Sequence, residues 1–276
     1  MNKRAVLPVN IDGIISYKPD ISDNYENYHV AGLDKLNLAE KYHFWFITRR
    51  DRILNEFRKN MDKSARVLEI GAGTGFIARG LQDEGYDVAI GEIHLSGLKY
   101  AKKNGIKECY QFNLFEPPFK EEFDVVGLFD VVEHLSDDVS ALKHVSKMLK
   151  PNGKLIITVP AHQWLWSRDD AIAAHKRRYS KKMLIHKAEE ANLEILDVKY
   201  FFITILPLLY LRHLLNRDSE DEITDDERRQ GFHINYLINK LLLILTMFEN
   251  KVSKYLPNIF GGSLFLIGVK KPVKSE

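Results

Sequence analysis

The segment that most constrains this chain is the run VLEIGAGTGF, residues 67–76. Its apolar first half is typical of a buried strand, and a helix-compatible segment, Phe76–Glu84, follows the glycines. Glycine lets the backbone turn sharply and lets a ligand approach where a Cβ would clash. Free N–H groups at the start of the next helix then face that ligand. The run therefore predicts a strand-loop-helix site for a nucleotide, with an ordinary tight turn as the alternative.

Two kinds of nucleotide site begin in this way. The dinucleotide fingerprint G-x-G-x-x-G/A places its first glycine directly after the strand. Counted from Gly71, its last position is Phe76, which fails. Counted from Gly73, it is Ala78, which fits, but the loop then begins two residues late. The second pattern is an acidic and an apolar residue followed by G-x-G-x-G, and residues 69–75 match it at every position. The frame therefore favours the second pattern.

Composition and charge narrow the class of protein. The chain has 276 residues and a net charge of +2, so nothing global points to nucleic acid. Cys109 is the one cysteine, which excludes an intrachain disulfide and a cysteine zinc cluster, and we expect no metal site. Residues 1–13 lack the apolar core of a signal peptide, and the longest apolar run, Phe201–Leu215, contains a proline, an arginine and a histidine. We therefore expect a cytoplasmic protein.

Strand-like and helix-like segments alternate along the central part of the chain. Such alternation favours an α/β fold with a mostly parallel sheet and helices on both faces. The turn Pro151-Asn152-Gly153 ends one helix and begins a strand. The expected strands are Arg66–Ile70, Val88–Ile93, Glu108–Phe112, Phe123–Phe129, Lys154–Val159, Ile195–Phe201 and Leu264–Val269, and the expected helices are Phe76–Glu84, Ser96–Asn104, Val139–Leu149 and Ser180–Asn192.

The N-terminal segment and a long stretch before the last strand lie outside this alternation. Residues 1–33 are polar and predicted irregular, with an exposed arm around residues 24–28, and residues 34–60 have helical spacing. Before the last strand, two apolar helical patterns, Leu206–Leu215 and Tyr236–Phe248, flank an acidic stretch, 218–227. We expect an arm and helical cap over residues 1–60, a core of residues 61–201 with 263–271, and a helical insertion over residues 202–262 that forms a lid or an oligomer face.

Polar residues follow the other predicted strands. Glu92 lies 19 residues after Gly73, at the end of the second strand, where a carboxylate can accept hydrogen bonds from both ribose hydroxyls. Asn113 ends the third, where its side-chain oxygen can accept a hydrogen bond from a ligand or from the backbone of a turn. The fourth is followed by DVVEHL, residues 130–135. Because ligands of open α/β sheets lie beyond the carboxyl ends of the strands, we expect these residues to meet in one crevice.

Together, these motifs resemble the class I S-adenosylmethionine-dependent methyltransferases, in the family's order from Val67 to about Pro160. Residues 175–179, HKRRY, and the N-terminal WF-x-x-RR, residues 45–50, resemble a small-molecule subgroup with a His-x-Arg-Arg-Tyr signature. Glu69, Glu92 and Asn113 depart from the aspartate that is frequent in the family, but each keeps an acceptor oxygen.

The resemblance implies a Rossmann-like sheet of seven strands whose last strand is reversed, and S-adenosylmethionine as the methyl donor. Arg49 or Arg50 is implied to reach the methionine carboxylate of the donor, and Tyr42 and Trp45 to close over it. The residues implied to bind the donor are Trp45, Arg49, Glu69, Gly71, Ala72, Gly73, Gly75, Glu92, Ile93, Asn113, Leu114, Asp130 and Val131.

The acceptor is an O or N of a small molecule, with sugar- and lipid-linked acceptors both open. An acceptor hydroxyl gains from a base, and His175 and His134 are the candidate catalytic residues, with a structural role as the alternative for each. The residues predicted to contact the acceptor are His162, Trp166, Arg178 and Tyr179, since rings offer flat walls and arginine a bidentate fork.

Two other functions stay open. A binding protein with a degenerate site would bind a nucleotide without turnover, and an NAD-dependent oxidoreductase is the rival enzyme. Methylation of nucleic acid is disfavoured, because no Asn-Pro-Pro-Tyr-like tetrapeptide follows the fourth strand and no basic patch of useful size is visible. A homodimer through the insertion is one possibility, and membrane contact is not favoured, since Arg212 and Lys240 are too few for a basic face.

Overall fold

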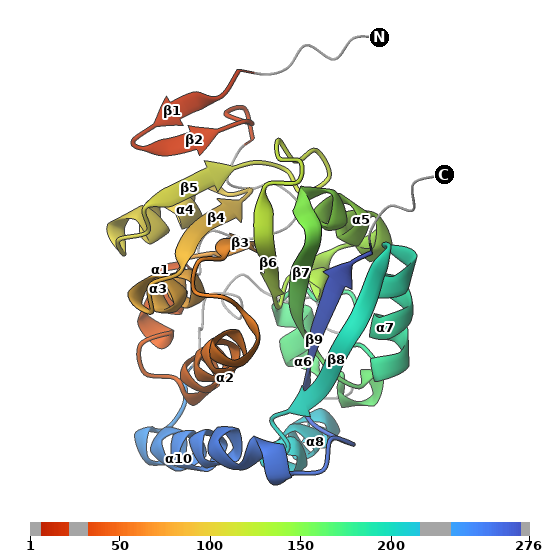
Figure 1. The fold of residues 1–276 in the computed structure, drawn as a ribbon. Helices are drawn as coiled ribbons and strands as arrows, with labels where there is room; N and C mark the ends of the chain where they lie inside the picture. The colour runs from red at the N-terminus through yellow and green to blue at the C-terminus, as the bar shows by residue number, and fades with distance from the viewer. Residues whose placement is uncertain (1–6, 22–32, 216–232, 272–276) are drawn as a thin grey trace.

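Nine strands form one sheet in the computed structural model, which describes residues 7–21, 33–215 and 233–271 (Figure 1). Across the sheet the strand order is β1-β2-β5-β4-β3-β6-β7-β9-β8. The strands are β1 (Val9–Ile11), β2 (Ile14–Ser16), β3 (Arg66–Ile70), β4 (Asp87–Glu92), β5 (Glu108–Gln111), β6 (Phe123–Phe129), β7 (Leu149–Pro160), β8 (Leu193–Phe201) and β9 (Ser263–Lys270).

The seven strands from β5 to β8 make the predicted sheet. Strands β5, β4, β3, β6 and β7 run parallel, and β9 is antiparallel to both β7 and β8. The Rossmann-like sheet with a reversed last strand is therefore confirmed. The prediction that residues 1–33 are irregular is wrong for residues 9–16, which form a hairpin whose second strand pairs with β5.

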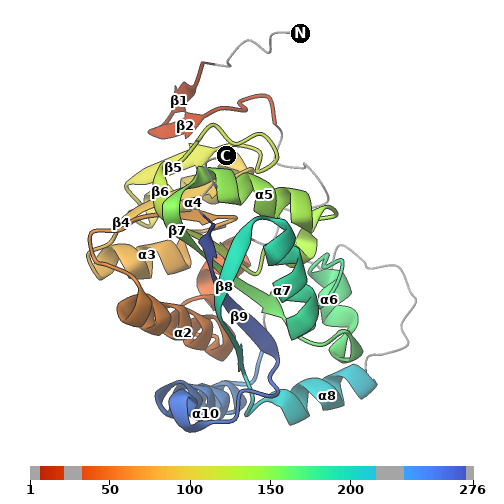
Figure 2. The ribbon, with the colours of Figure 1, turned by 45° about the vertical axis from the view of Figure 1, so that its right-hand side comes forward.

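Helices cover both faces of the sheet (Figure 2). Val67 and Leu68 show the reason, because alternate strand residues point to opposite faces and enter different apolar clusters. Helices α2, α3 and α4 bury their apolar sides in one cluster, and α5 and α7 in the other. The helices are α1 (Leu33–Ala39), α2 (Phe44–Asn60), α3 (Phe76–Asp83), α4 (Leu95–Lys103), α5 (Asp138–Met148), α6 (Arg168–Ile172), α7 (Lys181–Glu190), α8 (Leu206–Leu215) and α10 (Tyr236–Val252), with short 3-10 turns at η3 (Val132–His134), η4 (Gln163–Leu165) and η5 (Ser253–Tyr255).

The helical segment predicted over residues 34–60 is two helices, α1 and α2. They are separated at residues 40–43, and His43 caps α2 by accepting a hydrogen bond from the backbone N–H of Trp45 at 3.2 Å. This break lets α1 fold back over the loop after β3. There, Glu40 accepts a hydrogen bond from the hydroxyl of Thr74, and Leu36 lies 4.0 Å from the point where a Cβ on Gly73 would stand.

The insertion lies at the carboxyl end of the parallel strands. Helices α8 and α10 follow the end of β8 and precede the start of β9, which is also where β7 ends, because β9 is antiparallel to both strands (Figure 1). Helix α10 packs on α2, where Thr246 and Thr48 share a hydrogen bond of 2.7 Å and the side-chain amide of Asn250 donates to the carbonyl of Thr48 at 3.0 Å.

The predicted arm at residues 24–28 and the acidic stretch 218–227 lie outside the described residues. In the part of the chain that the structure covers, every helix is too short or too polar to cross a membrane. The division into cap, core and insertion and the cytoplasmic location stay predictions.

Candidate active site

The loop after β3 depends on its three glycines. Gly71, Gly73 and Gly75 all have positive φ angles, of 69°, 54° and 78°. A Cβ on Gly71 would lie 2.6 Å from a methyl carbon of Val131, so the loop and the segment after β6 approach too closely for any side chain. At Gly73, in contrast, the nearest atom outside the loop is a methyl carbon of Leu36 at 4.0 Å, which leaves room on the exposed side of the loop.

Glu92, at the end of β4, faces this loop. One carboxylate oxygen accepts a hydrogen bond from the backbone N–H of Gly73 at 3.1 Å, and the other accepts from those of Ile93 and His94 at 2.7 and 3.2 Å. These bonds fix the carboxylate at the carboxyl edge of the sheet, between the glycine loop and the start of α4. The structure therefore brings Glu92 and the loop together, as the sequence predicts.

Asn113 forms a turn after β5. Its side-chain oxygen accepts a hydrogen bond from the backbone N–H of Phe115 at 2.9 Å, which is the turn alternative of the sequence analysis. The neighbouring Leu114 is buried, and Ile93, directly after β4, is half-buried. Because the carbonyl of Ile93 accepts from the amide of Gln111 at 3.0 Å, the ends of β4 and β5 are tied together.

Arg49 and Asp130 form an ion pair between α2 and the end of β6. Asp130 also accepts from the hydroxyl of Thr158 at 2.8 Å, and its backbone has a φ of 56°, in the region that favours glycine. The Nε atom of Arg49 is buried and has no hydrogen-bond partner in the described part of the chain. The guanidinium therefore keeps one donor for a further group.

Two buried glutamates lie close to this pair. Burial raises the pKa of Glu69 to about 8, against the opposing charge of Arg49, and one of its carboxylate oxygens has no partner among the described residues. Burial also raises the pKa of Glu40 to about 7. An acceptor oxygen of Glu69 and a donor N–H of Arg49 are thus both buried here without a hydrogen-bond partner among the described residues. Such groups cost free energy unless a ligand supplies the missing hydrogen bonds.

On the other side of Asp130 lies a cluster of Glu133, His134 and His175. The ligand atoms of these three side chains all lie within 4.8 Å of one another. His175 contacts Asp170 through its Nδ1 atom at 2.8 Å, and its Nε2 atom lies 3.9 Å from Glu133. Burial, then the charge of His175, lowers the pKa of His134 to about 4, so this imidazole is neutral at pH 7.

A comparison with known proteins decides the family. Residues 41–198, more than half of the chain, match the model of a family described as a methyltransferase domain. The chain belongs to this family of methyltransferases. It is an S-adenosylmethionine-dependent methyltransferase.

Curated relatives match this chain over part of their length. The chain is 33% identical over 110 residues to a ubiquinone biosynthesis O-methyltransferase of Rickettsia conorii, which covers 37% of this chain and 38% of that protein. It is 30% identical over 127 residues to the enzyme of the same name from Bradyrhizobium diazoefficiens, 42% of this chain and 49% of that one. The chain thus spans less than half the length of these curated relatives.

A solved structure shares the fold over a greater length. A chain of the complex between the Haloferax volcanii Trm112 methyltransferase activator and its putative methyltransferase superposes with a TM-score of 0.58. The superposition covers 89% of this chain and 96% of that one at 15% identity, and at this identity the likeness shows the fold alone.

The residues present fit S-adenosylmethionine, the cofactor of this methyltransferase. Its methionine tail carries an ammonium and a carboxylate, and the site offers an unfilled carboxylate oxygen on Glu69 and an unfilled N–H on Arg49. Its ribose needs an acceptor, and Glu92 stands at the expected strand end. The individual donor contacts predicted from the sequence stay predictions.

The acceptor side of the methyltransferase differs from expectation at Tyr179. This side chain is fully buried, and its hydroxyl donates to Asp138 at 2.7 Å, which gives it a structural contact where an acceptor contact is predicted. Arg178 is nearly buried and donates through Nε to both oxygens of Asp170, at 2.8 and 2.9 Å. The Nε atom of Arg178 is therefore occupied, and only its other guanidinium nitrogens remain for the predicted contact with the acceptor.

Aromatic side chains line the loop after β7. The ring of His162 stacks on that of Tyr200, with centroids 5.1 Å apart and planes 7° apart, and lies 5.3 Å from that of Trp164. Trp166 is half-buried, and its carbonyl lies 2.6 Å from the Nδ1 atom of His213 in α8. Trp45 stacks on Phe202 at 4.2 Å, where the insertion begins.

Two functional candidates escape the sequence analysis. Glu133 lies inside the motif of residues 130–135, but its complete burial has no local signal. Asp170, also buried, sits in a segment without a recognised motif. Their importance comes from pairing with His175, which only the folded chain reveals.

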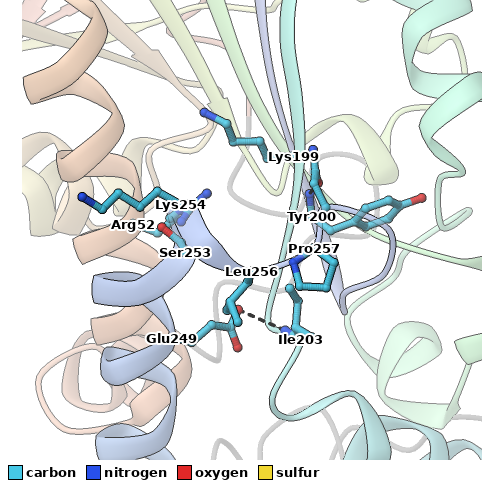
Figure 3. Close-up of a pocket in the computed structure, with 10 residues that line it drawn as sticks. Arg52, Lys199, Tyr200, Ile203, Glu249, Ser253, Lys254, Leu256 and Pro257 are labelled. Carbon is cyan, nitrogen blue, oxygen red and sulfur yellow. Dashed lines mark hydrogen bonds between the residues drawn. The ribbon is translucent and has the colours of Figure 1, made fainter.

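A pocket of about 160 Å³ lies at the base of the insertion (Figure 3). No residue of the glycine loop or of the Glu133, His134 and His175 cluster lines it. Lys199, Tyr200 and Ile203 line it from β8 and the segment after it, and Glu249 from α10. Glu249 accepts hydrogen bonds from the backbone N–H groups of Ile203 and Thr204, at 3.0 and 2.8 Å, so it ties α10 to the end of β8.

Proposed function

We propose that this methyltransferase transfers the methyl group of S-adenosylmethionine to a hydroxyl oxygen of a small molecule that carries a ring. The observation that carries the proposal is the cluster of Glu133, His134 and His175 next to the Arg49–Asp130 pair. A hydroxyl is a poor nucleophile until its proton leaves, so an O-methyltransferase needs a group of this kind at the acceptor. The printed names of the Rickettsia and Bradyrhizobium relatives support transfer to oxygen.

In this proposal the donor lies across the carboxyl edge of β3 and β4. The glycine loop gives its backbone to the methionine tail, Glu92 accepts from the ribose hydroxyls, and Ile93 and Leu114 enclose the base. Arg49 and Glu69 bind the carboxylate and the ammonium of the tail. Glu40, directly after α1, accepts a hydrogen bond from Thr74 of the loop, and we propose that α1 thereby shields the donor from water.

The reaction is an in-line displacement. The acceptor oxygen attacks the methyl carbon, the bond between that carbon and the sulfonium sulfur breaks, and the sulfur leaves as a neutral thioether. The hydroxyl proton passes to the Nε2 atom of His175, whose ring is held by Asp170 through Nδ1 at 2.8 Å. Because the donor is already activated, most of the rate enhancement comes from positioning the two partners.

The ring of the acceptor is proposed to rest on the aromatic side chains after β7. His162, Tyr200 and Trp164 present a stacked, partly open surface, and Trp164 is 48% exposed. Flat rings stack on such surfaces with offset geometry. An acceptor whose ring rests on this surface would extend an adjacent hydroxyl past Arg178 toward His175. Arg178 is placed beside the loop after β7 because it donates to the carbonyl of Ala161 at 3.3 Å.

The insertion is proposed to form an oligomer face beside this site. Helix α8 buries none of its residues, and α10 exposes apolar side chains along one side. The exposed large apolar residues of the two helices are Leu208, Tyr210, Leu211, Leu214, Leu215, Tyr236, Leu237, Ile238, Leu241, Ile244, Leu245 and Phe248. A contiguous surface of this kind marks an interaction site, and a second copy of the chain is the simplest occupant.

The test compares matched acceptors that differ only in the attacking atom. The full chain with isotopically labelled S-adenosylmethionine is given catechol, 1,2-diaminobenzene and their monofunctional analogues, and the products are separated by mass spectrometry. We expect methyl ethers from the phenols. Methylation of the amines alone would overturn the proposal, and so would donor binding without transfer to any acceptor.

A variant of the cluster gives a second test. His175→Asn removes an imidazole while keeping a polar side chain, and we expect turnover to fall at least 100-fold while the affinity for the donor changes little. Calorimetric titration with NAD serves as the check on the rival enzyme class. Tight binding of NAD with no response to S-adenosylmethionine would favour an oxidoreductase instead.

A further inference from the structure

Glu133 is in an unusual position for a carboxylate. It is fully buried, and both of its carboxylate oxygens lack a hydrogen-bond partner in the described part of the chain. A buried carboxyl group without a hydrogen-bond partner costs free energy in either protonation state, so the fold keeps it at some expense. A cation that occupies the space beside it would remove that cost.

The two nearby histidines are already oriented by other groups. The Nδ1 atom of His175 is taken by Asp170 at 2.8 Å, which leaves Nε2 on the side of Glu133. The Nδ1 atom of His134 lies 3.4 Å from the carbonyl of Ala174, and its ring meets that of His175 edge to face at 4.8 Å. Metal-binding histidines are typically held in this way, with one ring nitrogen on a carboxylate or carbonyl and the other on the metal.

We propose that Glu133, His134 and His175 bind a divalent first-row metal ion such as Zn²⁺. Two imidazoles and one carboxylate form a known ligand set for such ions, and a three-ligand site leaves positions open for water or substrate. Asp170 is then a positioning residue, which orients His175, and Asp130 is excluded as a ligand because Arg49 and Thr158 occupy it.

The spacing of the cluster is close to what a metal ion requires. Ligand atoms at about 2.1 Å from a tetrahedral zinc ion are separated by about 3.4 Å. The three ligand atoms here all lie within 4.8 Å, and the Nε2 atom of His175 is 3.9 Å from Glu133. The proposal therefore requires the ligand atoms to approach one another by about 1 Å when the ion binds.

The role of the ion rests on the proposed function. A hydroxyl bound at an open position of the metal has a lowered pKa, so it loses its proton to solvent near pH 7 and its oxygen is oriented toward the donor. With the ion bound, His175 serves as a ligand, and the metal ion activates the hydroxyl. The binding of the metal itself does not depend on which acceptor the enzyme uses.

The experiment measures metal binding directly. The full chain is freed of metal with a chelator and titrated with Zn²⁺ by calorimetry, and with Co²⁺ while its visible absorption is recorded. We expect one ion per chain and cobalt bands typical of a site with two imidazoles and one carboxylate. Glu133→Gln and His134→Gln should each weaken binding at least 100-fold, and Asp170→Asn about 10- to 100-fold.

The exposed histidine of α7 gives a matched control. His186→Gln should bind Zn²⁺ like the unmodified chain, since its side chain is 71% exposed and pairs with Glu190. Circular dichroism and donor titration check that each variant is folded, and either site variant suffices if the other does not fold. Unchanged Zn²⁺ binding in folded Glu133→Gln and His134→Gln, or no binding by the original chain, would overturn the proposal.

The failure of this proposal can be told from that of the proposed function. Methyl transfer to phenols by a chain that binds no Zn²⁺ in the titration would refute the metal site and keep the O-methyltransferase, whereas transfer that persists in excess chelator would refute only the role of the ion in the reaction. Stoichiometric Zn²⁺ binding with transfer to amines alone would keep the site and refute transfer to oxygen.

Discussion

Glu69 gives the most direct test of the donor site, because its burial has opposite consequences for stability and for binding. It is 3% exposed, one of its oxygens has no partner among the described residues, and burial raises its pKa from 4.5 to about 8. The substitution Glu69→Gln keeps the shape of the side chain and removes its titration. We expect the variant to be more stable than the original chain at pH 8 and to bind the donor more weakly.

The effect on stability follows from the two pKa values of Glu69. Between about 4.5 and 8, the folded state holds a proton that the unfolded state has lost, so the free energy of unfolding falls as the pH rises, by about 1.4 kcal/mol per unit. Over about 3.5 units this gives a ceiling of about 5 kcal/mol at pH 8. Glutamine does not titrate, so the free energy of unfolding of the variant rises relative to that of the original chain, by the same amount per pH unit.

The effect on binding has the opposite sign. If Glu69 accepts the ammonium of the donor, it binds in its ionised form, and each donor molecule that binds below pH 8 releases a proton. The affinity of the original chain for S-adenosylmethionine should therefore rise up to tenfold per unit between pH 6 and about 7.5. The glutamine variant should lose this slope, and its affinity at pH 7.5 should be at least tenfold lower.

Urea unfolding at several pH values and calorimetric titration in buffers of different ionisation enthalpy measure the two effects. Glu194→Gln, at an exposed position of β8, is the matched control and should change neither. The reasoning would be refuted by a variant that binds the donor as tightly as the original chain with the same pH slope, or by a difference in stability that does not grow with pH.

Three other substitutions test separate parts of the site. Gly71→Ala, at a φ of 69° and with its Cβ 2.6 Å from Val131, should cost about 1–3 kcal/mol in unfolding free energy and lower donor affinity at least tenfold, both measurable by denaturation and calorimetry. Arg49→Met leaves Asp130 without its cation and should cost up to about 3–5 kcal/mol, with weaker donor binding in the same assays. Phe248→Glu puts a charge on the exposed apolar side of α10 and should convert a dimer to a monomer in light scattering.

Each of these substitutions has a control. Gly85→Ala has a similar φ of 89° but open space around its Cβ, so it should lose stability and keep donor affinity. Arg50→Met removes a guanidinium that lies over a ring and should leave the donor site intact. Leu196→Glu, the control for Phe248→Glu, puts the same charge at an exposed apolar position of β8 and should leave the oligomeric state unchanged. An original chain that is monomeric at every concentration would contradict the oligomer face, and equal donor affinity in Gly71→Ala and Gly85→Ala would contradict the close approach at the loop.

The donor side could be predicted because its signals are local. The strand Phe123–Phe129 and the helix Leu206–Leu215 have the bounds that the sequence predicts, and Glu92 meets the glycine loop as expected. A parallel sheet brings the carboxyl ends of its strands to one edge, so motifs that follow those ends need no knowledge of packing to be placed together.

The hairpin β1–β2 was missed although a local signal was present. Asp12 and Gly13, with φ angles of 52° and 79°, form the two-residue Asp-Gly turn that favours a hairpin. Its strands have only three residues each, and they depend on a distant partner. The buried hydroxyl of Ser16 donates to the amide oxygen of Gln111, 95 residues away, at 2.7 Å. Short strands gain their stability from such contacts, and a sequence pattern does not contain them.

The signature HKRRY, residues 175–179, shows why the acceptor side is harder to predict. The sequence suggests that these side chains face a substrate, but two buried carboxylates take most of them. His175 and Arg178 converge on Asp170, while the other arginine and the tyrosine converge on Asp138. Through these two carboxylates, the motif ties the loop after β7 to the start of α5. These contacts leave the Nε2 atom of His175 facing Glu133, at 3.9 Å.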